Sequence, residues 1–140
     1  FIFSNKFCKD NKTASIKRFF NIFGTSHIVE NENKIDKVTA LTGSGPAYFI
    51  HFLEAMIQTF KKLGFSENEA ENYAEELFYG TAITCMNEKK SLKKIKDSVI
   101  SKGGTTDAAL KTLDALKFKS ILTKSIKEAY NKAQQLGKNK

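Results

Sequence analysis

The sequence contains little arginine, and its positive charge is almost entirely lysine. Arg18 is the only arginine among 23 basic residues, in a chain of 140 residues with a formal net charge of +8. The guanidinium fork of arginine suits base and phosphate recognition better than lysine does. Residues 89–96 form the densest basic cluster and contain no aromatic residue that could stack on a base. The charge therefore indicates a solvated lysine face and no nucleic-acid partner. Salt-dependent retention on DNA would test the opposite interpretation.

Long apolar runs and secretion signals are also missing. No stretch of 18 consecutive apolar residues occurs, so we expect no membrane-spanning helix. Residues 1–4 lack the basic start and apolar core of a signal peptide and resemble a chain entered in the middle of a fold. Cys8 and Cys85 have neither redox nor metal-binding spacing. We expect a globular, cytoplasmic protein without a metal site, in which Cys85 is a small core residue.

Two familiar catalytic patterns do not occur. The sequence has no G-x-G-x-x-G turn, so we expect no pyrophosphate site for a dinucleotide in this chain. His27 and His51 are isolated from one another, and no serine, histidine and aspartate set with a nucleophile elbow is present. His51 lies three residues before Glu54 on the polar side of a predicted helix. This spacing favours an ion pair at an interface over general-base chemistry.

Two glycine-rich segments are the most informative features that the sequence does contain. Residues 101–106 read Ser-Lys-Gly-Gly-Thr-Thr, and residues 42–46 read Thr-Gly-Ser-Gly-Pro. Each precedes a predicted helix, where exposed N–H groups and glycines that permit close approach form an anion site. For residues 101–106 the alternative is a helix start that Thr105 or Thr106 merely caps. For residues 42–46 the alternatives are close packing of a buried helix start and the wall of a ligand pocket.

The periodicity of apolar residues divides the chain at residue 34. Residues 1–34 predict a strand, a helix at 13–23 and a second strand, a combination that is marginally stable alone. From about residue 33 on, the pattern is all-helical. In the helix that follows Ser66, one stripe of side chains is predicted to face inward, namely Ala70, Tyr73, Ala74, Leu77, Phe78, Thr81, Ala82 and Cys85. The predicted helices span residues 33–41, 46–63, 67–85, 92–99, 106–116 and 119–136, and Ser66 with Glu69 predicts a capping box for the third.

The helix predicted at residues 46–63 is apolar on almost every side. Its polar residues form one narrow stripe, namely His51, Glu54, Gln58 and Lys61. Such a helix must be buried on most of its surface, and one small domain can hardly supply that cover. The sequence therefore predicts a partner chain.

Three segments together resemble the pyrroline-5-carboxylate reductase family. They are Ala-Leu-Thr-Gly-Ser-Gly-Pro-Ala-Tyr at residues 40–48, Lys-Leu-Gly at 62–64 and the glycine segment at 101–106. The resemblance extends over about residues 35–136. It implies an all-α, interlocking dimerisation domain at 35–140, like the C-terminal domain of 6-phosphogluconate dehydrogenase, preceded at 1–34 by the remnant of an α/β (Rossmann) domain. The family usually has proline where this chain has Lys102, which predicts a less rigid and more positive loop.

The resemblance also implies a function, the NAD(P)H-dependent reduction of 1-pyrroline-5-carboxylate to proline. It assigns the substrate carboxylate to Ser101, Gly103, Gly104, Thr105 and Thr106, and a catalytic role at the ring nitrogen to Thr106. Residues 43–46 would then lie near the nicotinamide if they line a pocket. It implies a homodimer and leaves open whether dimers assemble further.

The missing pyrophosphate turn limits what this chain can do alone. Cofactor-binding residues stay unassigned, no cofactor is expected on the chain, and we expect it to be inactive by itself. The alternative interpretation is a catalytically inactive dimerisation module that binds small carboxylates.

Overall fold

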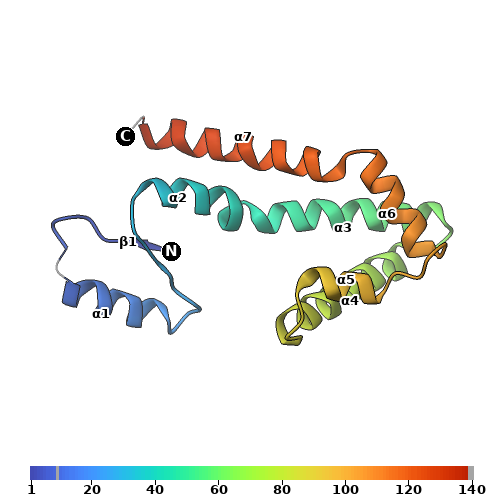
Figure 1. Cartoon of the computed structure of the whole chain (residues 1–140), viewed down its shortest axis with the longest axis horizontal. Coiled ribbons are helices and arrows are strands. Elements are labelled where there is room, and N and C mark those ends of the chain that lie inside the picture. The colour runs from blue at the N-terminus through green and yellow to red at the C-terminus, as the bar shows by residue number, and fades with distance from the viewer. Residues whose placement is uncertain (9, 139–140) are drawn as a thin grey trace. The chain divides into compact units, whose positions relative to one another are not determined.

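The computed structural model describes residues 1–8 and 10–138, which fall into two compact units. Unit 1 contains the described residues up to 46 and from 122 onward, and unit 2 contains residues 47–121. Most of the chain is helical, which confirms the predicted all-α class with a short α/β segment in front (Figure 1). In chain order the elements are β1 (Ile2–Phe3), α1 (Asp10–Phe20), β2 (Ile28–Val29), α2 (Asn33–Val38), the π-helical turn η1 (Thr39–Gly43), α3 (Gly45–Lys62), α4 (Glu67–Asn87), α5 (Leu92–Ser98), α6 (Thr105–Ala115) and α7 (Phe118–Lys138).

Unit 1 begins with the predicted strand, helix and strand. β1 and β2 are parallel, with Ile2 opposite Ile28 and Phe3 opposite Val29. Two buried hydroxyl residues tie α1 to its surroundings. The Thr13 hydroxyl lies 2.8 Å from that of Ser4, and the Ser26 hydroxyl donates to the Lys17 carbonyl over 3.1 Å. Near the other end of the unit, a Cβ built on Gly137 of α7 would lie 3.9 Å from a carboxylate oxygen of Asp36 in α2.

The predicted loop at residues 42–46 is wrong, because only Ser44 separates two helical stretches there. The turn η1 follows α2 directly, and the Ser44 N–H donates to the Thr39 carbonyl over 3.0 Å. The hydroxyls of Thr39 and Thr42 donate to the carbonyls of residues 35 and 38 over 2.9 and 3.0 Å. Hydroxyl bonds of this kind compete with the regular backbone ladder, and here they accompany the wider π-turn.

Unit 2 holds most of the predicted helices, within three residues of their predicted ends. The capping box of α4 is confirmed: the Ser66 N–H donates to Glu69 Oε2 over 2.9 Å, and the Glu69 N–H donates to Ser66 Oγ over 3.4 Å. Aromatic contacts join α3 to its neighbours. The Phe49 and Phe78 rings are 5.6 Å apart, and those of Phe52 and Phe118 are 6.3 Å apart.

The apolar faces of unit 2 are largely uncovered. Among the described residues of the whole chain, only Ala40, Ala70 and Ala74 are buried hydrophobic residues. The inner stripe predicted for α4 is wrong for its large side chains, since Tyr73, Leu77 and Phe78 are exposed. The predicted core position of Cys85 is also wrong, because Cys85 is only half-buried and lines an apolar groove between α4 and α5. Nothing else in unit 2 covers these faces.

Candidate functional site

The loop between α5 and α6 contains two glycines, and each has a different role in its backbone. Gly103 has φ of +76°, a left-handed conformation that residues with side chains adopt with difficulty. Gly104 is the N-cap residue of α6, and its N–H donates to the Ser101 carbonyl over 2.9 Å. A Cβ atom on Gly104 would lie 3.1 Å from that carbonyl oxygen, so a side chain would crowd the turn. The conformation of the loop therefore favours glycine at 103, and a side chain at 104 would push against the Ser101 carbonyl.

The first turn of α6 directs its amide groups toward this loop. The first intrahelical bond runs from the Ala108 N–H to the Gly104 carbonyl over 3.1 Å. The N–H groups of Thr105, Thr106 and Asp107 thus precede any carbonyl of their own helix. Gly104 is the N-cap and has no side chain, so the alternative in which Thr105 or Thr106 caps the helix is wrong. Thr105 is exposed and Thr106 is half-buried.

The structure adds one residue that the sequence interpretation missed, Asp107. Its Oδ2 accepts the Gly103 N–H over 2.9 Å and the Lys111 ammonium over 2.9 Å. The hydrogen bond from Lys111, and then that from Gly103, hold the pKa of the Asp107 carboxyl below its ordinary value. The sequence signal is an acidic residue in the first helical turn with lysine four residues later. Since the N–H groups of Gly103 and Gly104 are already bonded, those of Thr105 and Thr106 are the better ligand donors.

This arrangement predicts a pH dependence of the loop. Because the folded pKa of Asp107 lies below the unfolded value of about 3.9, its contribution is present above that value and is lost as pH falls through the folded pKa. We expect the Gly103 amide resonance to be constant from neutral pH to about 4 and to move below it. NMR spectra recorded against pH test this, and Asp107→Asn should remove the transition. A transition centred above about 4 would contradict it, since that requires a raised pKa.

The second glycine segment lies in unit 1, whereas residues 101–106 lie in unit 2. Gly45 is buried, and a Cβ on Gly43 would lie 3.7 Å from Thr39 Cγ2. The Thr42 hydroxyl is bonded to Val38 of the preceding turn. A Cβ on Gly45 would meet no atom within 4 Å, and Thr42, Gly43 and Pro46 are exposed, so these contacts do not support close packing of a buried helix start in the single chain. A role as a pocket wall stays a prediction.

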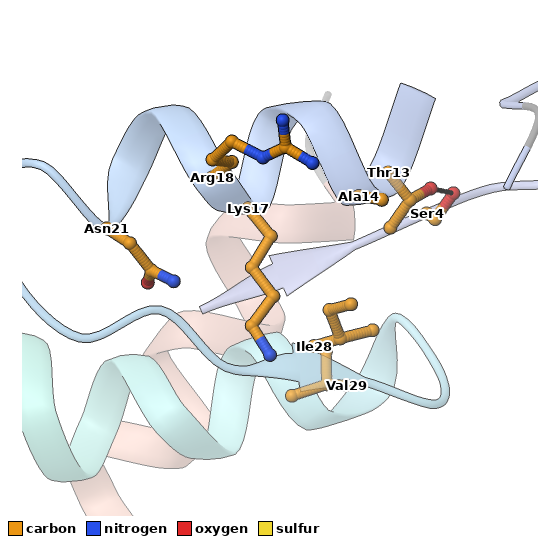
Figure 2. A pocket seen from close by; sticks show the side chains of 8 residues that line it. All are labelled: Ser4, Thr13, Ala14, Lys17, Arg18, Asn21, Ile28 and Val29. Atoms are coloured by element: carbon orange, nitrogen blue, oxygen red, sulfur yellow. Dashed lines mark hydrogen bonds between the residues drawn. The ribbon is translucent and has the colours of Figure 1, made fainter. Parts of the chain in front are cut away.

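A cleft in unit 1 lies between α1 and the two strands, and Figure 2 shows the side chains that line it. Lys17 extends from α1 toward Ile28 and Val29, and the paired hydroxyls of Ser4 and Thr13 close one end (Figure 2). The remaining lining residues are Ala14, Arg18 and Asn21. The cleft combines polar groups with apolar strand residues.

The turn from β1 into α1 does not fit a dinucleotide pyrophosphate. Such a site needs a glycine-rich turn with free N–H groups after a parallel strand. Residues 4–8 contain no glycine. The N–H groups of Phe7 and Cys8 instead donate to the Asn5 side chain and carbonyl over 3.1 and 3.0 Å. This turn therefore lacks the features of a pyrophosphate-binding turn.

The described residues contain one exposed histidine–glutamate pair and no cluster of metal ligands. No group of three or more histidine, cysteine, aspartate and glutamate side chains in residues 1–8 and 10–138 could hold a metal ion. His51 and Glu54 form the predicted pair, with Nδ1 and Oε2 3.3 Å apart, and both side chains are exposed. Within the same part of the chain, no helix has both the length and the apolar character that crossing a bilayer requires.

Comparison with known proteins identifies relatives of nearly the whole chain. A pyrroline-5-carboxylate reductase from Synechocystis is 34% identical over 98% of this chain and 51% of its own length. One from Staphylococcus aureus is 33% identical over 96% of the chain and 49% of its own length. The chain thus spans about half the length of the curated relatives that it matches.

Solved structures and a family profile agree with these relatives. Pyrroline carboxylate reductase from Plasmodium falciparum, solved with NADP bound, has a TM-score of 0.87 at 28% identity, over 96% of this chain and 51% of that one. The enzyme from Coxiella burnetii has a TM-score of 0.88 at 29% identity, over 96% and 50%. The family described as pyrroline-5-carboxylate reductase dimerisation matches residues 32–136, three quarters of the chain. The matched residues include the whole loop at 101–106, and the chain belongs to this family.

Proposed function

We propose that this chain forms the dimer core and the substrate-carboxylate loop of a pyrroline-5-carboxylate reductase, which reduces 1-pyrroline-5-carboxylate to proline with NAD(P)H. The observation that carries the proposal is the first turn of α6. It presents the Thr105 and Thr106 N–H groups beside a loop that two glycines keep open. The family match at residues 32–136 supports the same assignment.

The proposed chemistry of this loop is anion binding followed by orientation of the substrate ring. The positive end of the α6 dipole and the free N–H groups of Thr105 and Thr106 hold the carboxylate. The Ser101 hydroxyl is exposed at the loop entrance and adds a donor, while Gly103 and Gly104 contribute space. The Thr106 hydroxyl then faces the ring nitrogen and donates a hydrogen bond or a proton there. Nicotinamide would supply the hydride when the cofactor is bound, and residues 4–8 after β1 contain no glycine that would admit its pyrophosphate.

The domain division belongs to the same proposal. Residues 1–34 form the end of an α/β domain, and residues 35–140 form the helical dimerisation and substrate-binding domain. The family match begins at residue 32, close to this boundary. The short parallel pair of β1 and β2, joined through α1, is the smallest piece of such a sheet and is marginal without further strands.

Self-association is the second part of the proposed function. Phe49, Ile50 and Phe52 of α3 are 60%, 56% and 46% exposed, although they lie on the most apolar helix of the chain. Isolated proteins rarely expose contiguous apolar patches of this kind. A second copy that covers α3 and α4 removes these side chains from water, and obligate interfaces of this type bury more than about 2,000 Å².

Proline binding tests the carboxylate loop. We expect L-proline to shift the Thr105 and Thr106 amide resonances, with a dissociation constant on the order of millimolar, because only a few charge-assisted bonds hold it. Thr106→Val should weaken binding about threefold to tenfold through loss of one hydrogen bond. Thr112→Val is the matched control, since its hydroxyl donates to Ala108 farther along α6.

A substitution at Gly104 tests whether the ligand needs the open backbone. Gly104→Val adds a side chain beside the Ser101 carbonyl and should block proline while α3 and α4 keep their structure. If proline shifts the same loop amides equally in the variant and the parent, the carboxylate binds elsewhere and the proposal fails.

A further inference from the structure

One side chain of α6, that of Asp107, forms a hydrogen bond to the backbone of the loop at residues 101–104. Gly104 is tied to Ser101 through the backbone, but Gly103 is tied to the carboxylate of Asp107, which accepts its N–H over 2.9 Å. Gly103 is also the residue with the left-handed φ of +76°. Glycine has more backbone freedom than any other residue, so Gly103 would leave this conformation readily in the absence of a bond. The hydrogen bond to Asp107 therefore holds Gly103 in its left-handed conformation.

The Asp107 carboxylate also brings a negative charge to the helix end at which the substrate carboxylate is proposed to bind. Lys111, one turn farther along α6, places its ammonium 2.9 Å from the same oxygen that accepts the Gly103 N–H. The Asp107 side chain is 19% exposed and that of Lys111 is 73% exposed. Lys111 thus offsets the charge from the solvent side and leaves the Gly103 bond in place.

The cleft beside this pair carries more charge from neighbouring elements. Lys96 of α5, Asp114 of α6 and Lys119 of α7 line it together with Asp107 and Lys111. Lys119 and Asp114 are 3.4 Å apart and form a second, separate pair. Because Asp114 pairs with Lys119 of α7, its replacement is a suitable control for the replacement of Asp107.

We propose that Asp107 and Lys111 are positioning residues of the carboxylate loop. Asp107 holds Gly103 in the conformation that leaves the Thr105 and Thr106 N–H groups open to the ligand, and Lys111 offsets the charge of Asp107 so that an anion can approach. The identity of the ligand rests on the proposed function. The effect of Asp107 on the Gly103 conformation can be measured without any ligand.

The experiment compares four variants of the full chain by amide hydrogen exchange and proline titration. Asp107→Ala should speed exchange at Gly103 about tenfold and weaken proline binding about threefold to tenfold. Asp107→Asn keeps an acceptor oxygen and should restore Gly103 exchange to within about twofold of the parent. Lys111→Gln should weaken proline binding about twofold at low salt and have no effect at high salt, because exposed charges are screened. Asp114→Ala should leave both readouts unchanged.

The outcomes separate this proposal from the proposed function. Unchanged Gly103 exchange in Asp107→Ala, or an equal change in Asp114→Ala, would overturn the positioning role. Tighter proline binding by Asp107→Ala would overturn it as well, because the carboxylate would then compete with the ligand. If the parent binds no proline at all, the proposed function fails. The exchange rate of the Gly103 amide still decides whether Asp107 holds Gly103 in its conformation.

Discussion

Replacement of Ile50 by aspartate is expected to abolish dimer formation and to lower the thermal midpoint of the chain sharply. Ile50 is 56% exposed in the single chain, so a monomer would tolerate this change at little cost. In a dimer that covers α3, each protomer buries an unpaired carboxylate. That burial, with the lost packing, costs on the order of 4 kcal/mol per protomer, and because a dimer contains two such sites it weakens association about a millionfold.

Gln58→Asp provides the matched control for this substitution. Gln58 is exposed on the polar stripe of the same helix, and the substitution introduces the same charge. Sedimentation of both variants at micromolar concentration separates the two cases. An Ile50→Asp chain that sediments as the parent does, with an unchanged melting temperature, would show that this face of α3 is not an interface.

The purified chain is expected to show no NAD(P)H-dependent reduction of pyrroline-5-carboxylate. Hydride transfer needs a nicotinamide held against the imine carbon, and residues 4–8 after β1 contain no glycine, while the Phe7 and Cys8 N–H groups are already bonded to Asn5. The measurement is the absorbance of reduced nicotinamide with substrate present, and a full-length enzyme of the family is the positive control. Turnover proportional to the concentration of this chain would contradict the prediction.

The helices of unit 2 could be predicted because each one begins, ends and repeats its apolar residues according to neighbours in the sequence. The apolar run at residues 46–63, the capping box of Ser66 and Glu69, and the glycines at 103 and 104 each act within a few residues. The extent of the glycine loop follows for the same reason. The left-handed conformation of residue 103 favours glycine there, and the N-cap position at 104 accepts glycine as one of its common residues.

The π-turn at Thr39–Gly43 could not be predicted in the same way. Glycine and proline at residues 43–46 indicate a loop in any pattern-based interpretation. The chain instead stays helical up to Gly43 and again from Gly45 on, and the hydroxyls of Thr39 and Thr42 donate to carbonyls of the turn before them. Whether a hydroxyl bonds within a helix depends on side-chain geometry that the sequence pattern does not contain.

Asp107 was missed for a different reason. A capping box is recognised from a hydroxyl residue at the N-cap and an acidic residue three positions later, but here the N-cap is Gly104. The carboxylate bonds to Gly103, one residue before the N-cap. The burial of Tyr73, Leu77 and Phe78 was mispredicted because periodicity identifies an apolar face without identifying the chain that covers it.

The most direct test of the central claim is the mass of the unmodified chain in solution. Sedimentation equilibrium at micromolar concentration should give twice the chain mass of 15.7 kDa, with no dissociation on dilution to nanomolar concentration. This result is expected because the uncovered apolar faces of α3 and α4 are those of an obligate interface. A folded, stable monomer of 15.7 kDa at micromolar concentration would contradict the account.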